Sequence, residues 1–215
     1  MSLWLPPDAG ANGRDVPLSA PARAAATPGA SRPPALFLDR DGCLMVDRNY
    51  LADPDRVEVL PGVPQALRRA RRSGYLLVGL SNQSGVGRGF FTLADLDAVM
   101  ARFHRLLAAE GAALDAYLYC PHAPTDRCRC RKPGPGLLEE ASRRLSWDPA
   151  GSWVVGDKLS DVDLGLSAGM GAILVRTGHG AEQEQGLGER LGQPRLLVAD
   201  DFPAAVAAIL EREPT

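Results

Sequence analysis

The sequence predicts an α/β fold built on an open, mostly parallel, Rossmann-like sheet with helices on both faces. Short apolar runs alternate with helix-length amphipathic segments, a pattern typical of βαβ units. The chain has 215 residues and is 45% hydrophobic, which is enough for one well-packed domain and short for two. Each apolar run also ends in polar residues, and open α/β sheets bind ligands beyond the carboxyl ends of their strands.

The apolar runs and the helical periodicities define the elements in order. Buried strands are predicted over residues 35–39, 75–81, 116–120, 153–157 and 172–176. Shorter helices are predicted over residues 63–72, 136–145, 160–168 and 202–211. A long helix is predicted over residues 92–111, where apolar residues recur at helical spacing behind a capping box of Thr92 and Asp95. The segment after Gly180 is rich in Glu, Gln and Gly, which indicates a solvated connection before a final strand and helix.

Residues 1–34 are predicted to form a flexible tail before a domain that spans residues 35–215. This tail holds seven prolines and eight alanines with few large apolar side chains, a composition that cannot bury a core. It lacks the continuous apolar centre of a secretion signal, so a cytoplasmic location is expected. An organelle-type leader, or a start codon placed too early, would have a similar composition.

The charge and the hydropathy of the chain argue against two classes of partner. A formal net charge of -2 gives no general reason to expect a nucleic-acid or membrane surface. No window of the sequence reaches the apolar run that spans a bilayer.

A cluster of soft ligands lies in the stretch CPHAPTDRCRCRKP. Cys120, His122, Cys128 and Cys130 supply the three sulfurs and one imidazole of a closed tetrahedral zinc site, which is structural because no position is left for water. Chance clustering or a disulfide is the alternative, but a reduced intracellular chain rarely uses cysteines in this way. The single-residue gaps within each pair of ligands require sharp turns of the backbone.

Two carboxylates follow the first predicted strand, in the stretch LDRDG. Asp39 and Asp41 repel each other, so they either share a hard cation or differ in protonation. Both outcomes suit phosphoryl transfer, in which an ionised Asp39 attacks phosphorus and Asp41 protonates the leaving oxygen and then activates water. Asp157 would complete the metal site. A calcium-binding loop is excluded, because the glycine comes too early and the twelfth position is Tyr50 rather than glutamate.

The ends of the other strands carry groups that suit a transferring phosphoryl group, whose charge needs fixed donors and cations. Ser81 offers a hydroxyl, Lys132 a point charge, and Asn82 with the following SGVGRG offers amide donors. The spacing matches neither a Walker A loop nor a dinucleotide-binding fingerprint. Taken alone, Ser81 is more often a cap and Lys132 a solvated surface charge, so the argument depends on the set.

Four stretches, LDRDG, SNQSGVGRG, CPH followed by CRCRKP, and GDKLSD, occur in this order within residues 35–180. Together they resemble the motifs of the haloacid dehalogenase superfamily of aspartate-nucleophile phosphatases, and within it the D-glycero-D-manno-heptose 1,7-bisphosphate 7-phosphatases. The resemblance implies a fold without a large cap domain and with a zinc-bound loop near the active site. It also implies a monomeric, Mg2+-dependent hydrolase that removes the 7-phosphate of this small sugar phosphate in nucleotide-activated heptose biosynthesis.

The same resemblance implies a role for each motif residue. Asp39 would be the nucleophile, Asp41 the general acid and base, and Ser81 and Lys132 would hold the phosphoryl group. Mg2+ would be bound by Asp39, the carbonyl of Asp41, and Asp157. Contacts to the sugar or its phosphates would come from Asp47, Arg48, Asn49, Tyr50, Asn82, Gln83, Ser84, Arg131 and Lys158. Zinc would be bound by Cys120, His122, Cys128 and Cys130.

Two positions depart from the family pattern. Cys43 stands where threonine is usual after the glycine of the first motif, and Ser81 replaces threonine in the second motif. Both replacements are small, so activity is expected to survive them. Cys43 itself is expected to be a buried small residue rather than a reactive thiol.

Histidinol-phosphate phosphatases are the alternative within the same fold, because they share the zinc loop. The heptose interpretation is favoured by SNQSGVGRG with Arg88 and by a cationic group that could bind a second phosphate. This group comprises Arg127, Arg129, Arg131 and Lys158. For Arg127 and Arg129, ordinary surface charge is an equal alternative.

Two further alternatives belong to other classes. In a zinc-stabilised, non-catalytic binding module the carboxylates would be idle, and Arg68, Arg69, Arg71 and Arg72 could contact nucleic acid. In a phosphotransferase, the phosphoryl group of an aspartyl-phosphate would pass to a second sugar instead of to water.

Overall fold

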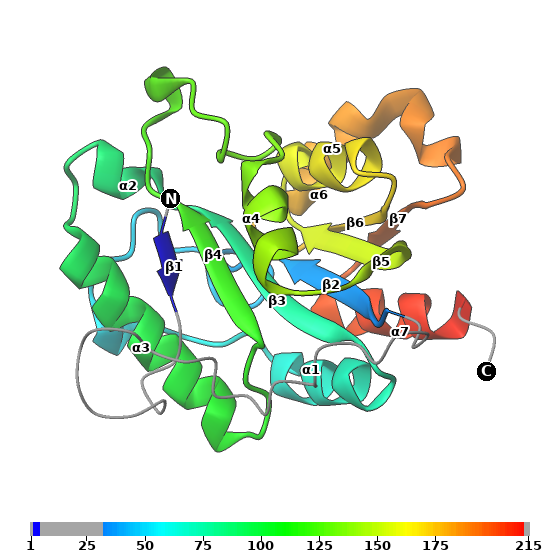
Figure 1. Cartoon of the computed structure of the whole chain (residues 1–215), viewed down its shortest axis with the longest axis horizontal. Helices are drawn as coiled ribbons and strands as arrows, with labels where there is room; N and C mark the ends of the chain where they lie inside the picture. The colour runs from blue at the N-terminus through cyan, green and yellow to red at the C-terminus, as the bar shows by residue number, and fades with distance from the viewer. Residues whose placement is uncertain (1, 5–31, 213–215) are drawn as a thin grey trace.

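The computed structural model describes residues 2–4 and 32–212, and all their strands belong to one sheet (Figure 1). The strands are β1 (Ser2–Trp4), β2 (Pro34–Leu38), β3 (Leu76–Asn82), β4 (Ala116–Cys120), β5 (Asp148–Gly156), β6 (Gly171–Val175) and β7 (Leu196–Ala199). Their spatial order is β1-β4-β3-β2-β5-β6-β7. The six strands from β2 to β7 run parallel, and β1 is antiparallel to β4 at one edge. The predicted open, mostly parallel sheet is therefore confirmed.

Helices connect the strands and cover both faces of the sheet. The α-helices are α1 (Val63–Arg72), α2 (Ser84–Gly87), α3 (Leu93–Ala109), α4 (Gly136–Arg144), α5 (Leu159–Ser167), α6 (Gly180–Gln183) and α7 (Phe202–Arg212). The 3-10 segments are η1 (Pro54–Arg56), η2 (Pro124–Asp126) and η3 (Glu184–Gly192). The predicted long helix is α3, and the Thr92 hydroxyl accepts from the Asp95 amide while the Asp95 carboxylate accepts from the Thr92 amide, as the capping box requires.

Alternation of side chains along the central strand divides the core into two layers. Leu36 and Leu38 of β2 pack with α1, α3 and α7, whereas Ala35 and Phe37 face the layer that contains α4 and part of α5. Successive side chains of a strand point to opposite faces, so one short apolar run fills both layers. Cys43 is fully buried beside the first layer, as expected, and burial raises the pKa of its thiol.

The N-terminal end differs from the sequence-based expectation. Residues 2–4 form β1, which pairs with Tyr117, Leu118 and Tyr119 of β4, although composition places them in the tail. An edge strand exposes a row of unpaired backbone groups, and β1 satisfies that row on β4. Residues 5–31, the greater part of the predicted tail, lie outside the described residues.

Two segments outside the predicted helices contain helical turns. The glycine-rich stretch after Gln83 begins with the short helix α2, in which Ser84 and Gly85 are buried. The connection after Gly180 forms α6 and η3, and Leu187 within it is 1% exposed because it packs against Val162 and Leu196. Two isolated leucines in a polar stretch, Leu187 and Leu191, are too weak a sequence signal for this packing. Within the described residues, no helix combines the length and apolar character needed to cross a membrane.

Candidate active site

The carboxyl ends of the parallel strands bring the predicted motif residues to one edge of the sheet. Asp39 directly follows β2, Ser81 lies near the end of β3, and Asp157 directly follows β5. Lys132 comes from the loop after β4, which folds back over the same edge. Residues separated by more than a hundred positions therefore meet because parallel strands end together.

Lys132 is the cation at the centre of this site. Its Nζ lies 2.7 Å from Asp39 Oδ1 and 2.6 Å from Asp161 Oδ1, and it donates to the Leu80 carbonyl at 2.7 Å. All three charged side chains are buried. Burial opposes the charge of Lys132, but Asp161 and Asp39 outweigh it and raise the pKa of the ammonium.

The charge state of Asp39 follows from the same contacts. Burial would raise the pKa of its carboxyl, but Lys132, and then Lys158, outweigh burial and hold this pKa below its ordinary value. Asp39 is therefore an ionised carboxylate at neutral pH. An ionised, buried carboxylate at a strand end is a competent nucleophile.

The backbone of Lys132 is held by Asn82 through two reciprocal hydrogen bonds. The Lys132 amide donates to Asn82 Oδ1 at 2.9 Å, and Asn82 Nδ2 donates to the Lys132 carbonyl at 3.2 Å. A Cβ at Gly134 would lie 2.5 Å from the Arg129 carbonyl oxygen, so the loop turns too tightly there for any side chain. The position of the cation thus depends on how the whole loop is folded.

Asp157 is fully buried, and its carboxylate lies within 4.8 Å of that of Asp39. The desolvation of its carboxyl, together with the nearby charge of Asp39, raises the pKa of Asp157 to about 7. The His179 amide donates to Oδ2 at 2.9 Å, whereas Oδ1 accepts no hydrogen bond among the described residues and lies 3.6 Å from Lys158 Nζ. A Cβ at Gly42 or Gly178 would lie 2.3 Å from Oδ2, so both glycines leave room for this carboxylate. A buried oxygen that accepts no hydrogen bond and lies beside a second carboxylate is an arrangement that a hard cation completes.

Asp41 faces a different set of partners. Arg40 donates to both of its carboxylate oxygens, with Nη2 2.9 Å from Oδ1 and 2.8 Å from Oδ2. Gln83 Nε2 donates to Asp41 Oδ2 at 2.8 Å and to Ser81 Oγ at 2.7 Å. The two carboxylates of the LDRDG stretch therefore have separate environments, Lys132 for Asp39 and Arg40 for Asp41.

The three cysteines and the histidine of the zinc prediction converge. Cys120, Cys128 and Cys130 have sulfur-to-sulfur distances of 3.3 to 3.6 Å, and His122 Nδ1 lies 3.6 and 3.2 Å from the sulfurs of Cys120 and Cys130. A tetrahedron with Zn–S bonds of about 2.3 Å has edges of about 3.7 Å. The four ligand atoms therefore already stand at nearly the spacing that one zinc ion requires.

A cavity of about 220 Å³ opens next to the LDRDG loop, and its lining includes Gly42, Asp47, Asn49 and His179. Asp47 Oδ2 lies 3.3 Å from His179 Nε2 and 3.6 Å from Lys158 Nζ. The other predicted substrate contacts Asn82, Gln83 and Ser84 lie at the end of β3 beside Ser81. These residues share one side of the sheet edge with Asp39.

Arg48 and Tyr50 have partners of their own. Arg48 pairs with Glu58 at 2.5 Å, and Tyr50 is half exposed and packs edge to face against Phe90, with ring centroids 4.8 Å apart. Arg131, the neighbour of Lys132, is half-buried. Arg129 forms an exposed ion pair with Glu139, which favours the surface-charge interpretation of that residue.

Three residues of this site were not among the predicted site residues. Asp161 is the second partner of Lys132, Arg40 is the partner of Asp41, and His179 holds Asp157 from the loop after β6. The Asp161 signal was present in the sequence, since GDKLSD places a second carboxylate one helical turn beyond Asp157. Arg40 and His179 have no local pattern that reveals their partners.

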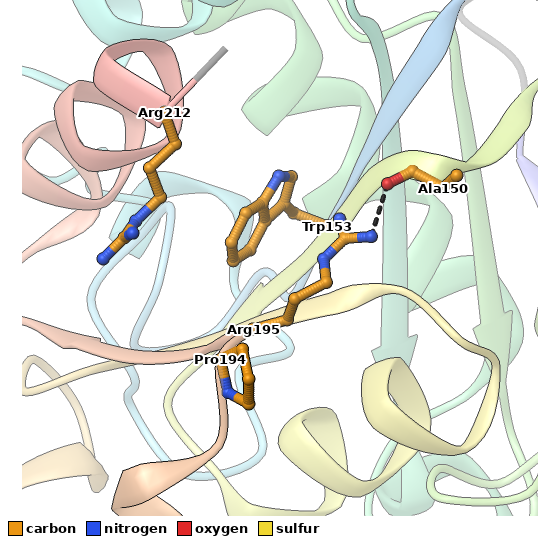
Figure 2. A pocket seen from close by; sticks show the side chains of 5 residues that line it. All are labelled: Ala150, Trp153, Pro194, Arg195 and Arg212. Atoms are coloured by element: carbon orange, nitrogen blue, oxygen red, sulfur yellow. Dashed lines mark hydrogen bonds between the residues drawn. The ribbon is translucent and has the colours of Figure 1, made fainter.

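A second cavity, of about 510 Å³, lies beside β5, the segment that precedes β7 and the end of α7 (Figure 2). Its lining includes Ala150 and Trp153 of β5, together with Arg195 and Arg212. The Arg195 guanidinium stacks 5.0 Å from the Trp153 ring centroid and donates to the Ala150 and Ser152 carbonyls. Although this cavity is larger, its lining includes none of the motif residues described above.

Comparisons with known proteins agree with this arrangement. Residues 129–205 match the family model described as HAD-hydrolase-like. The chain is 36% identical over 177 residues to a D-glycero-beta-D-manno-heptose-1,7-bisphosphate 7-phosphatase of Pseudomonas aeruginosa, covering 82% of this chain and 97% of that protein. It is 42% identical over 153 residues to the protein of the same name from Escherichia coli K12, covering 67% and 80%.

Solved structures show the same similarity. The crystal structure of D,D-heptose 1,7-bisphosphate phosphatase from B. bronchiseptica, complexed with magnesium and phosphate, superposes with a TM-score of 0.75 at 37% identity, covering 83% of this chain and 99% of that one. A putative HAD-like phosphatase from Mesorhizobium loti gives a TM-score of 0.70 at 35% identity, covering 86% and 90%.

Proposed function

This chain belongs to the D-glycero-D-manno-heptose 1,7-bisphosphate 7-phosphatase family of HAD-like hydrolases, and we propose that it removes the 7-phosphate of this sugar in nucleotide-activated heptose biosynthesis. The observation that carries the proposal is the buried contact of Lys132 with Asp39, 2.7 Å from Nζ to Oδ1. It joins an ionised carboxylate to a fixed cation at the edge of the sheet where ligands bind. A binding module with idle carboxylates would not need this buried pair.

In the first step, Asp39 attacks the phosphorus of the 7-phosphate. A bond forms between Asp39 and phosphorus while the bond from phosphorus to the sugar oxygen breaks, and protonated Asp41 gives its proton to that oxygen. Lys132 and the Ser81 hydroxyl stabilise the charge on the transferring phosphoryl oxygens. The products of this step are the sugar alcohol and an aspartyl-phosphate at Asp39.

In the second step, water takes the place of the sugar. Asp41, now a carboxylate, accepts a proton from the water that attacks phosphorus, and the bond to Asp39 breaks. Inorganic phosphate leaves, Asp39 is again a carboxylate, and Asp41 again carries its proton. The cycle therefore returns each carboxyl to its starting state.

Mg2+ fits the residues beside Asp39. Hard oxygen ligands come from the Asp39 carboxylate and from the buried Oδ1 of Asp157, which accepts no hydrogen bond and lies 3.6 Å from Lys158 Nζ; the Asp41 carbonyl would be added to them. When bound, the ion neutralises charge on the phosphate oxygens and lowers the repulsion between the carboxylates. Asp161 pairs with Lys132, so we assign it to the balance of the buried charges and not to the Mg2+ ligands.

The pKa of Asp157 predicts how Mg2+ binding varies with pH. A carboxyl whose pKa is raised from 3.8 to about 7 is protonated in the metal-free fold at pH 5.5, so a proton competes with the cation. The increase in melting temperature on adding Mg2+ should therefore be larger at pH 8 than at pH 5.5. Thermal unfolding with and without Mg2+ measures this, and Asp157→Asn should remove most of the increase at both pH values. An Mg2+ effect independent of pH would contradict the assignment.

We also propose that a structural zinc ion is bound by Cys120, His122, Cys128 and Cys130. The fold of the loop that carries Lys132 would depend on this ion. The sulfur and nitrogen spacing supports the proposal, because four groups without an ion would have no reason to converge. The ion would stabilise the fold of a loop that has few apolar residues, and it would help Asn82 to fix the backbone of Lys132.

Cys130→Ala should test this zinc site. Loss of one ligand is expected to reduce zinc from one to less than one per chain and to lower both the melting temperature and kcat, because Lys132 loses its fixed position. Metal analysis with a thermal scan measures both effects. Cys43→Ala is the matched control, since Cys43 is buried away from the cluster and should leave zinc content unchanged. Wild-type protein without zinc would contradict the site.

The substrate is the sugar bisphosphate rather than histidinol phosphate in this proposal. Contacts to the sugar or its phosphates are proposed for nine residues, which are Asp47, Arg48, Asn49, Tyr50, Asn82, Gln83, Ser84, Arg131 and Lys158. Lys158 supports this, because its half-exposed ammonium lies between the site carboxylates and the cavity near Asp47.

A panel of phosphate esters tests the choice. Phosphate release under Mg2+ is expected to be fastest from heptose 1,7-bisphosphate, and the C1 phosphate should remain on the product. Faster release from histidinol phosphate would overturn the substrate assignment. Transfer of phosphate to added alcohols at the expense of free phosphate would instead show a phosphotransferase.

A further inference from the structure

Arg40, the residue between the two aspartates of the LDRDG stretch, is a buried cation that the two-step mechanism does not use. It is 1% exposed and is the largest fully buried side chain among the described residues. A guanidinium cannot lose its charge in a protein, so its burial must be compensated by a partner. A nonpolar residue of similar volume would fill this part of the core without that requirement.

The partner is Asp41, and the contact involves both carboxylate oxygens. Arg40 Nε and Nη2 lie 3.1 and 2.9 Å from Asp41 Oδ1, and Nη2 lies 2.8 Å from Oδ2. The remaining nitrogen, Nη1, contacts the sulfur of Met100 on α3 at 3.1 Å. The planar guanidinium group of Arg40 therefore contacts the core on one side and the Asp41 carboxylate on the other. This fork of donors restricts the rotation of the carboxylate.

Gln83 completes the arrangement. Its Oε1 accepts from Arg40 Nη2 at 3.1 Å, and its Nε2 donates to Asp41 Oδ2 and to Ser81 Oγ. Arg40 therefore orients Asp41 directly and also orients the amide that links Asp41 to the proposed phosphate-binding hydroxyl of Ser81. The Asp41 side chain keeps 18% of its surface exposed, so it is held at the border of the core and the site.

We propose that Arg40 is a positioning residue for Asp41. While Asp41 is a carboxylate, as its N–H donors from Arg40 and Gln83 require, Arg40 holds it where it can accept the proton of the attacking water and, once protonated, give a proton to the leaving oxygen. The effect of Arg40 on the reaction is then confined to the steps in which Asp41 transfers a proton. Those steps matter for a sugar alkoxide, which leaves poorly without a proton, and much less for an aryl oxide, which leaves without one. The inference rests on the phosphatase function proposed above.

Arg40→Met tests the proposal, since it removes the fork and keeps an unbranched side chain beside Met100. First-turnover rates are measured by rapid quench with heptose 1,7-bisphosphate and with p-nitrophenyl phosphate. The variant should form product from the bisphosphate on the order of a hundredfold more slowly, with KM nearly unchanged. With p-nitrophenyl phosphate, the first release of nitrophenolate should stay near the wild-type rate, and the phosphoenzyme should then accumulate because water attack is slow.

Equal losses on the two substrates would overturn the proposal, because a purely structural residue would damage both first turnovers alike. Arg40→Lys keeps the buried charge without the fork, and it should show a smaller loss with the same preference for the aryl ester. If Arg40→Met does not fold, the first-turnover rates of Arg40→Lys test the proposal instead. Wild-type rates of Arg40→Lys on both substrates would refute positioning by the fork. Arg143→Met is the matched control, since Arg143 is exposed on α4. If wild-type enzyme releases no phosphate from the bisphosphate, the proposed function fails instead.

Discussion

Asp39→Asn is expected to abolish phosphate release while the protein stays folded. The amide has the shape of the carboxylate but cannot form a bond to phosphorus, so kcat should fall on the order of 10⁴-fold or more. Lys132 keeps Asp161 as its partner at 2.6 Å, which preserves the buried charge balance. Phosphate detection with saturating substrate, together with a thermal scan and zinc analysis, measures these outcomes.

Asp163→Asn is the matched control for this variant. Asp163 lies on α5 with a part-exposed side chain that pairs with Arg190, so its loss should leave kcat unchanged. An Asp39→Asn protein that is folded and retains wild-type activity would refute the nucleophile and would favour a role of this carboxylate in binding alone.

Lys132→Met should produce the second largest effect, on both activity and stability. The ammonium is 3% exposed and pairs with two buried carboxylates, so its removal leaves Asp39 and Asp161 without their contacting cation and with only the more distant Lys158 to offset their charge. Breaking a buried ion pair in this way costs about 3 to 5 kcal/mol in the free energy of unfolding. The transferring phosphoryl group also loses its fixed cation, and kcat should fall on the order of 10³-fold.

Urea unfolding and steady-state kinetics measure the two losses for Lys132→Met separately. Arg129→Met is a control from the same loop, because its exposed pair with Glu139 contributes little. Unchanged unfolding free energy in Lys132→Met would show that the buried carboxylates do not depend on this cation.

Much of the fold could be predicted because its signals are local. The run ALFLD, the capping box of Thr92 and Asp95, and the helical periodicity behind it each report a short segment, and β2 and α3 form where these patterns predict them. The strand ends were equally informative, because parallel strands bring Asp39, Ser81 and Asp157 to one edge without further information.

The rest depended on contacts between distant residues. β1 pairs with β4 across more than a hundred positions, and nothing in the Pro- and Ala-rich tail specifies that pairing. In the sequence, Arg40 cannot be distinguished from an exposed polar residue of a turn. Only its contacts with Met100 and Gln83 in the structure show that it is buried. The partnership of Asp161 with Lys132 likewise needs the loop after β4 to fold back over the sheet.

Reductive trapping of the intermediate tests most directly the claim that Asp39 carries the phosphoryl group. The enzyme is mixed with heptose 1,7-bisphosphate and Mg2+, quenched in acid during the first turnover, and treated with borohydride, which reduces an acyl phosphate to an alcohol. Mass spectrometry of the peptides should then find homoserine in place of aspartate at position 39, and no such product in Asp39→Asn. Homoserine at another carboxylate, or product release in the first turnover without any reduced residue, would contradict the mechanism.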